Sequence, residues 1–261
     1  MAALGGGDLA FVPTMGAFHE GHLSLMREAR KAAPRVCVSI FVNPLQFGPG
    51  EDLSRYPRNE DRDFDLADSL GVDIVFAPSA GAMYPRQITK VCVPEVTRLW
   101  EGAARPGHFD GVATIVAKLF NIVRPRTAFF GWKDLQQCLV VKRMVEDLDI
   151  PVELRFLETV REDDGLAMSS RNAYLSKEER AVAPALHATL LRIAIALRTG
   201  KADASAALED ARLALTGEGF QVEYLELVSM RDLEPTHATG DSAIIVAARL
   251  GQTRLIDNLR L

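Results

Sequence analysis

The chain has 261 residues, of which 48% are hydrophobic and 25% are charged, and its formal net charge is −5. A chain of this length can bury a core large enough for one large domain and one small domain. The acidic balance, with no cluster of Lys and Arg to offset it, argues against a nucleic-acid partner.

Membrane insertion and secretion are also disfavoured. No uninterrupted apolar run approaches the ~20 residues of a membrane span. Residues 1–7 have no basic region and no long apolar core, so they do not indicate a secretory signal. Cys37, Cys92 and Cys138 lie in apolar runs, and an odd number of buried-looking thiols indicates a reducing compartment. We therefore expect a cytoplasmic protein without a membrane partner.

The first predicted unit is a strand, a tight turn and a helix. Apolar residues 9–12 predict the strand, Gly16 lies in the turn, and the helix begins near His22. The N–H groups and the positive dipole end of such a helix form a cradle for phosphate. His19 and His22 can donate hydrogen bonds to phosphoryl oxygens there, and Gly21 has no Cβ to block a nucleotide.

Three other interpretations of this stretch stay open on spacing alone. Residues 19–22 lack one residue of the metalloprotease zinc motif, and neither Cys92 nor His108 has a convincing third-ligand spacing. The histidines could be ordinary residues of a first helical turn, and the glycines could serve the turn alone. The pattern matches neither a Walker loop nor a Gly-x-Gly-x-x-Gly loop.

The next segments continue an alternation of strands and helices. Residues 36–42 predict a strand buried on both faces, residues 60–70 a helix, and residues 72–77 a third strand. Residues just past a strand's carboxyl end line the ligand crevice of an open α/β sheet, which makes Asn43 and Gln46 candidate ligand groups. The alternatives are turn chemistry for Asn43 and a surface position for Gln46.

A less regular region follows. Residues 91–93 indicate a short strand, and the glycine-rich loop 101–111 carries Arg105 and His108. From Val112 the apolar residues fall at helical spacing as far as residue 123. The loop before this helix is a second candidate anion site, and a plain connector is nearly as good an interpretation.

The opening pattern then repeats. Residues 127–130 predict a strand, Gly131 a turn, and the segment after it an amphipathic helix that reaches Leu148. Lys133 can reach a phosphate as a mobile point charge, although a single lysine is most often only solvated. Gln137 lies four residues further along the same helical face.

The last strand of this half is expected at residues 152–159, and residues 168–172, Met-Ser-Ser-Arg-Asn, follow a charged turn. Two hydroxyls and an arginine in a flexible stretch suit a triphosphate. The alternative is a capping turn before Ser176, which heads a capping box with Glu179.

The composition changes after this point. Two alanine-rich helices and three strands of a small sheet are expected at residues 176–199, 203–215, 222–228, 243–248 and 253–256. The sequence therefore predicts an α/β fold, with a Rossmann-like doubly wound parallel sheet in residues 1–161 and a smaller C-terminal α+β domain in residues 162–261.

The motif Pro-Thr-Met-Gly-x-x-His-x-Gly-His at residues 13–22 resembles the nucleotidyltransferases that share a fold with class I aminoacyl-tRNA synthetases. In this longer form it is similar to the pantothenate synthetases, or pantoate–β-alanine ligases. Further segments match that family in order, at residues 39–47, 56–58, 101–109, 130–137, 164–172 and 254–258.

The resemblance implies an enzyme that ligates pantoate and β-alanine to pantothenate. ATP would first convert pantoate to a pantoyl adenylate, and the reaction would release AMP and pyrophosphate. It also implies Mg²⁺ with the ATP, a homodimer, an ATP- and pantoate-binding first domain, and a second domain that closes as a lid.

The family pattern assigns roles to residues of this chain. Catalytic roles fall to His22, His19, Lys133, Ser169, Ser170 and Arg171. The ATP-binding set comprises Met15, Gly16, His19, His22, Gly131, Trp132, Lys133, Asp134, Val160, Met168, Ser169, Ser170 and Arg171. The substrates would contact Gln46, Gln137, Asn43 and Arg105, with His108 beside Arg105, and the nearest acidic candidates for the metal are Asp63 and Asp61.

Two departures from the family pattern stand out. Trp132 replaces the usual glutamate before Lys133, and the chain begins close to its first strand, where family members have an extra lead-in unit. These departures keep a non-catalytic nucleotide-binding module in view. Another adenylyl- or cytidylyltransferase of the same fold is the alternative among enzymes.

Overall fold

The computed structural model describes residues 8–86, 89–199 and 203–261. The opening heptapeptide, which the sequence does not mark as a secretory signal, lies outside the described residues. The chain divides into two compact units, of which the first comprises Met1–Trp132 and Gln136–Glu158. The second comprises Lys133–Leu135 and Thr159–Leu261.

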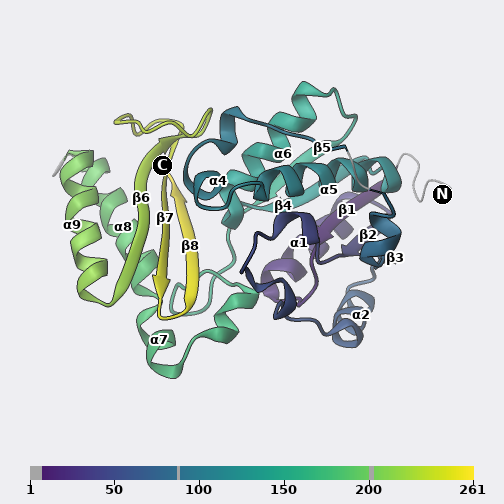
Figure 1. The fold of residues 1–261 in the computed structure, drawn as a ribbon, viewed down its shortest axis with the longest axis horizontal. Coiled ribbons are helices and arrows are strands. Elements are labelled where there is room, and N and C mark those ends of the chain that lie inside the picture. The colour runs from purple at the N-terminus through teal and green to yellow at the C-terminus, as the bar shows by residue number, and fades with distance from the viewer. Residues whose placement is uncertain (1–7, 87–88, 200–202) are drawn as a thin grey trace. The chain divides into compact units, whose positions relative to one another are not determined.

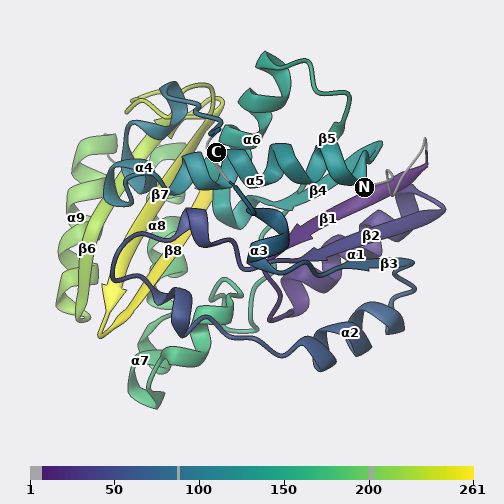
Figure 2. The same cartoon turned by 45° about the vertical axis from the view of Figure 1, so that its right-hand side comes forward.

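The first unit is built on a parallel sheet of strand order β3-β2-β1-β4-β5, which Figure 2 shows. Its strands are β1 (Leu9–Thr14), β2 (Arg35–Ile40), β3 (Ile74–Phe76), β4 (Thr127–Gly131) and β5 (Glu153–Leu157). The strand order reverses at β1. From β1 the chain adds β2 and β3 on one side, and it then returns to add β4 and β5 on the other side. The predicted Rossmann-like doubly wound sheet is confirmed.

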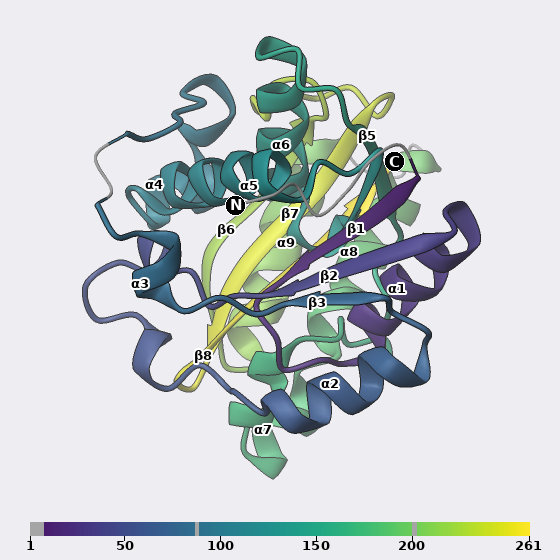
Figure 3. The ribbon, with the colours of Figure 1, turned by 90° about the vertical axis from the view of Figure 1, so that its right-hand side faces the viewer.

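Helices cover both faces of this sheet, as Figure 3 shows. On one face lie α1 (Glu20–Ala32) and α2 (Glu60–Ser69), whose apolar sides pack with Val12, Val38 and Phe129 in one core cluster. The other face carries α5 (His108–Val123) and α6 (Leu135–Asp147). Side chains alternate along a strand, so Phe11 turns to that side, where its ring lies 6.4 Å from the ring of Phe120.

The connection between β3 and α5 contains two short helices, α3 (Ala80–Met83) and α4 (Trp100–Ala104). The short strand predicted at residues 91–93 is wrong. The Val91 N–H donates to the Thr114 hydroxyl at 2.9 Å, so this segment bonds to a helix side chain and not to a strand. The expectation that all three cysteines are buried is also wrong, because Cys92 is exposed.

The second unit is a small α+β domain, as the sequence predicts. Its antiparallel sheet has the order β6-β7-β8, and α8 and α9 cover one face of it, as Figure 1 shows. The elements are α7 (Lys177–Val182), α8 (Ala185–Arg198), α9 (Ala204–Gly217), β6 (Phe220–Ser229), β7 (Ser242–Leu250) and β8 (Thr253–Arg260).

The single helix expected over residues 176–199 is two helices. Pro184 has no N–H to donate, and α7 ends at Val182 just before it. The predicted capping box is confirmed: the Ser176 N–H donates to Glu179 Oε2 at 2.8 Å, and the Glu179 N–H donates to Ser176 Oγ at 3.1 Å.

Among the residues described, the stretch Lys177–Arg198 is long and apolar enough, by length and composition, to cross a membrane. A core helix of a folded domain passes the same test. In this structure the stretch is α7 and α8, and Leu186, Leu190 and Ile193 of α8 belong to the core of the second unit.

We predict that Gly111→Ala destabilises the protein by about 2 kcal/mol or more, as overpacking does. A Cβ on Gly111, within α5, would lie 2.3 Å from the Leu45 carbonyl oxygen, and a backbone atom cannot swing away. Gly217→Ala is the matched control, because a Cβ at that position of α9 meets no atom within 4 Å. Urea unfolding measures both variants. Equal stability of the two would contradict the prediction.

Candidate functional site

The turn after β1 is held by a carboxylate from α2. The backbone N–H groups of Ala17 and Phe18 donate to the two oxygens of Asp63, at 2.7 and 2.8 Å, and Asp63 is 1% exposed. Gly16 has a φ of +81°, and a Cβ there would lie 2.9 Å from the same carboxylate. Because both oxygens of Asp63 bind backbone, its observed role is to fix this turn.

The described ranges contain no group of three or more His, Cys, Asp or Glu side chains suited to a metal ion. The assignment of Asp63 to magnesium therefore stays a prediction.

The two histidines form the N-terminal cap of α1. The Gly21 N–H donates to His19 Nδ1 at 3.2 Å, and the His19 N–H donates to His22 Nδ1 at 3.4 Å. Since Nδ1 accepts in both rings, each neutral imidazole carries its proton on Nε2. The centroids of the His19 and His22 rings lie 4.1 Å apart, so their two Nε2–H groups lie close together at the N-terminus of α1.

Gly21 serves this cap more directly than it serves a ligand. A Cβ at position 21 would lie 2.9 Å from Nδ1 and Cε1 of His19. The absence of a side chain therefore lets the His19 ring lie over the backbone N–H of Gly21.

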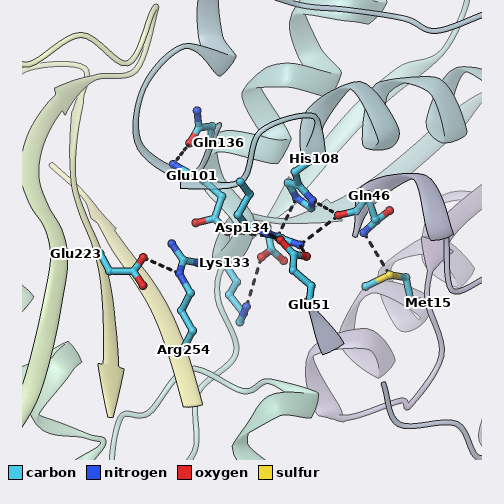
Figure 4. A network of polar contacts seen from close by, with 11 residues as sticks. Met15, Gln46, Glu51, Glu101, His108, Lys133, Asp134, Gln136, Glu223 and Arg254 are labelled. Atoms are coloured by element: carbon cyan, nitrogen blue, oxygen red, sulfur yellow. Dashed lines mark hydrogen bonds and ion pairs between the residues drawn. The ribbon is translucent and has the colours of Figure 1, made fainter. Parts of the chain in front are cut away.

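Gln46 lies just beyond β2, in a 3₁₀ turn, and both ends of its amide are engaged, as Figure 4 shows for the contact with Met15. Its Nε2 donates to Met15 Sδ at 3.2 Å, and its Oε1 accepts from Asn43 Nδ2 at 3.0 Å. Asn43 is 1% exposed and also accepts from the Tyr84 hydroxyl at 2.7 Å. Asn43 thus fixes the orientation of the Gln46 amide.

Arg105 is the centre of a partly buried polar network in the same unit, and Figure 4 shows its partners Glu51, Glu101 and His108. Its Nε and Nη2 donate to the two oxygens of Glu51 at 3.0 and 2.6 Å, and its Nη1 donates to Glu101 at 3.3 Å. Nη2 also reaches the Gln46 carbonyl oxygen at 3.2 Å. The guanidinium nitrogens therefore donate to groups of the protein itself, and in this structure they support the loop that carries Gln46.

His108 completes the network as a neutral ring. Arg105 Nη1 donates to His108 Nε2 at 3.2 Å, so the ring proton lies on Nδ1, which donates to the Gln46 carbonyl at 2.8 Å. Burial, with the adjacent Arg105 charge, lowers the pKa of His108 to about 4. Burial alone would raise the pKa of Glu51, but the hydrogen bonds and charge of Arg105 hold it below its ordinary value.

Strand β4 ends at Gly131, and Trp132 follows it directly. The Trp132 ring packs on Phe156 of β5 with its centroid 4.7 Å away, so an aromatic contact occupies this position. Gln136 is 9% exposed, accepts from the Glu101 N–H and donates to the carbonyl oxygens of Val96 and Leu99. Gln137 beside it is only partly buried.

Sequence reasoning missed several side chains of this unit, namely Glu51, Glu101, Gln136 and Tyr84. The spacing of Glu101 and Arg105, four residues apart, was the available signal for one ion pair. The contacts of Glu51 and Tyr84 join segments 54 and 41 residues apart, which no local pattern reveals.

The remaining predicted residues belong to the second unit. Lys133 and Asp134 lie in a 3₁₀ turn, with Lys133 Nζ 3.4 Å from Asp134 Oδ1. Val160 and Met168 are paired through the Met168 N–H, which donates to the Val160 carbonyl at 3.0 Å. Ser169 caps the 3₁₀ helix that starts at Ser170, because its Oγ accepts from the N–H of Arg171 at 3.3 Å.

The predicted residues of the first unit gather at one edge of the sheet. Met15 and Gly16 follow β1, Gln46 follows β2, and Gly131 ends β4, and these are neighbouring parallel strands. The carboxyl edge of such a sheet, where the strand order reverses, is the ligand-binding position of doubly wound folds. With a helix N-terminus and two N–H donors there, the fold and site define a nucleotide-binding α/β protein.

Comparison with known proteins identifies the family. The sequence model described as pantoate-beta-alanine ligase matches residues 2–260. The chain is 50% identical over 255 residues to a pantothenate synthetase of Acinetobacter baumannii, covering 97% of this chain and 90% of that protein. It is 51% identical over 257 residues to one of Heliobacterium modesticaldum, covering 97% and 92%.

Solved structures agree. The crystal structure of pantothenate synthetase from Thermus thermophilus matches with a TM-score of 0.95 at 50% identity, covering 99% of this chain and 95% of that one. A pantoate-beta-alanine ligase from Francisella tularensis, complexed with beta-gamma ATP and beta-alanine, matches with a TM-score of 0.82 at 32% identity, covering 97% and 89%.

The chain belongs to the pantoate–β-alanine ligase family. It is accordingly an enzyme that forms pantothenate from pantoate and β-alanine with ATP.

The His108 ring makes a pH-dependent contribution to stability. Its folded-state pKa of about 4 lies below the ordinary value of 6.5, so the contribution is present above pH 6.5 and is lost as the pH falls toward 4. We predict that wild type loses about 2 kcal/mol more unfolding free energy than His108→Asn between pH 7 and pH 5.

Urea unfolding of both proteins at the two pH values measures this difference. Asparagine does not titrate and retains an N–H donor for the Gln46 carbonyl, so other titrating groups cancel in the comparison. Parallel pH curves for the two proteins would contradict a buried neutral imidazole.

Proposed function

We propose that the enzyme works through a pantoyl-adenylate intermediate. A carboxylate is a poor acyl donor, and attack of the pantoate carboxylate on the α-phosphorus of ATP makes a mixed anhydride that the β-alanine amine can open. AMP and pyrophosphate are then the products. The observation that carries this proposal is the double cap of α1, in which both histidines accept a backbone N–H through Nδ1 at a helix N-terminus.

His19 and His22 stabilise the charge that grows on the phosphates in the first step. A fixed donor aimed at developing charge lowers a barrier by about 3 kcal/mol. His22 is the proposed proton donor. Its Nδ1 is held by the His19 N–H, so the ring does not need to reorient when the charge appears.

Cationic and hydroxyl groups at residues 133 and 169–171 are also proposed to bind the phosphates of ATP. Lys133 supplies a point charge, and Ser169, Ser170 and Arg171 supply hydroxyls and a fork of N–H donors. Backbone groups hold the rest of the ATP, at Met15, Gly16, Gly131, Trp132, Asp134, Val160 and Met168. Because Trp132 packs on Phe156, we assign it a backbone contact.

Pantoate is proposed to bind Gln46 and Gln137. Neutral amides hold its hydroxyls without neutralising the carboxylate that has to attack. Asn43 and Arg105, which we expected to contact substrate directly, are proposed to act by holding Gln46, since their polar atoms bind protein groups.

Mg²⁺ enters this scheme with its substrate, as Mg·ATP bound mainly by phosphate oxygens and water. Asp63 is the residue proposed to contact it. A homodimer, a cytoplasmic location and closure of the second unit as a lid over the adenylate are further parts of the proposal, which rest on the family resemblance. The Francisella relative binds an ATP compound and β-alanine, which supports the same substrates here.

We predict that His22→Asn lowers the single-turnover rate constant for pyrophosphate release by about 10²–10³-fold, while the Kd for ATP changes by less than about threefold. Asparagine keeps an acceptor for the cap but removes the Nε2–H donor. The measurement mixes enzyme, Mg·ATP and pantoate without β-alanine and follows pyrophosphate and bound adenylate.

The matched control is His237→Ala, because His237 is exposed and lies outside the site. That variant should retain the wild-type rate. Formation of ADP in place of pyrophosphate would exclude the adenylate scheme, and an unchanged rate in His22→Asn would remove His22 from it.

A further inference from the structure

Lys133 is held by the second unit although its chain neighbours belong to the first. The chain leaves the first unit after Trp132 and returns to it at Gln136, and Lys133–Leu135 cluster with the second unit. A lysine side chain is long and flexible, so its reach depends on where its backbone is fixed. The contacts of the Lys133 backbone are therefore the relevant ones.

One such contact comes from β8. Asn258 Nδ2 donates to the Lys133 carbonyl oxygen at 3.0 Å, and Asn258 is 6% exposed. This bond joins residues 125 positions apart in sequence. The Lys133 carbonyl oxygen needs a hydrogen-bond donor at this position, which is largely shielded from water, and the Asn258 amide nitrogen is that donor.

Asn258 is itself well fixed. Its backbone pairs with Ile245 of β7, and its N–H donates to Asp257 Oδ1 at 2.8 Å. Asp257 is 4% exposed and receives both terminal nitrogens of Arg161, at 2.7 and 2.9 Å, with His187 Nδ1 3.5 Å away. A bidentate, buried ion pair of this kind holds the end of β8 in one geometry.

The same ion pair reaches the serine–arginine segment. Arg161 pairs with Ala167 across a short antiparallel bridge and donates to the Gly165 carbonyl at 3.1 Å. Residues 169–171 follow directly. In the dipeptide Asp257–Asn258, the Asn258 side chain thus contacts the backbone of Lys133. The Asp257 side chain contacts Arg161, at the base of the loop that leads to Ser169.

We propose that Asn258 is a positioning residue for Lys133. Asn258 holds the backbone of Lys133, and the adjacent Asp257–Arg161 pair keeps that backbone in a fixed position relative to the loop 160–171. The inference rests on the proposed function, because it requires Lys133 to bind the phosphates of ATP. Asn258 acts through Lys133 and does not touch substrate. Misplacement of a binding group by about 1 Å can cost 10²-fold in rate, so loss of this bond should be visible in kcat.

The test uses the full chain and the pantoate-dependent release of pyrophosphate from Mg·ATP. Asn258→Ala should lower kcat by about 10–100-fold. Asn258→Asp, which places an acceptor against the carbonyl oxygen, should lower it at least as much. The KM for β-alanine, measured in the full reaction, should stay within about twofold of wild type for either variant.

The decisive measurement is a double-mutant cycle with Lys133→Ala. If Asn258 acts through the lysine, Asn258→Ala should change the rate of the Lys133→Ala enzyme by less than about twofold. An equal loss in both backgrounds overturns the positioning role. Leu255→Ala is the control for stability, since it opens a cavity on the same strand and should lower Tm while the kcat of folded enzyme stays within about twofold.

Failure of the positioning role can be distinguished from failure of the proposed function. A Lys133→Ala enzyme with the wild-type rate overturns the phosphate role of Lys133 and the positioning role with it. A slow Lys133→Ala enzyme together with wild-type rates for both Asn258 variants overturns the positioning role alone.

Discussion

The site of the first unit depends on the carboxylate of Asp63. It receives the N–H groups of Ala17 and Phe18, the two residues that link the glycine turn to the first residue of the α1 cap. A buried carboxylate that accepts two backbone hydrogen bonds is worth more than an average contact, because each bond is charge-assisted and little water competes. Asp63 therefore fixes where His19 begins the helix.

The two nitrogens of an imidazole explain why the α1 cap uses histidines. A serine or aspartate would satisfy the first N–H groups equally well. An imidazole satisfies them with one nitrogen and keeps a second nitrogen, on the opposite side of the ring, as a donor. His19 and His22 therefore stabilise the helix and prepare a ligand contact with the same side chains, and Gly21 provides the space that this requires.

The sequence predicted elements whose signal is local. The strands of the parallel sheet, the Ser176 capping box and the α+β character of the second unit all follow from periodicity and end signals. The helix break at Pro184 could have been predicted from the proline, but the alanine-rich composition on both sides favoured one continuous helix. The segment 91–93 was misassigned because its partner is a threonine hydroxyl 23 residues away, and a tertiary contact of that kind leaves no periodic pattern.

The candidate site likewise contains some features with a local sequence signal and others that depend on tertiary contacts. The histidine, glycine and lysine positions were proposed because their residue types carry the chemistry, and their roles stay predictions. The support for Gln46 could not be predicted, since it depends on a buried set of charges brought together by folding. Within that set the Arg105 guanidinium faces the carboxylates of Glu51 and Glu101, and His108 beside it is neutral.

This pairing has a consequence for a carboxylate substrate. An unpaired arginine beside Gln46 would bind the pantoate carboxylate strongly and lower its nucleophilicity. An arginine bound by two carboxylates belongs to a group with a net negative charge, which does not attract a carboxylate. Removing Arg105 would leave the carboxylates of Glu51 and Glu101 without their shared cationic partner, which is destabilising. The network thus supports the loop of Gln46 and adds no net positive charge at that end of the site, which leaves the positive charge to the groups proposed to bind phosphate.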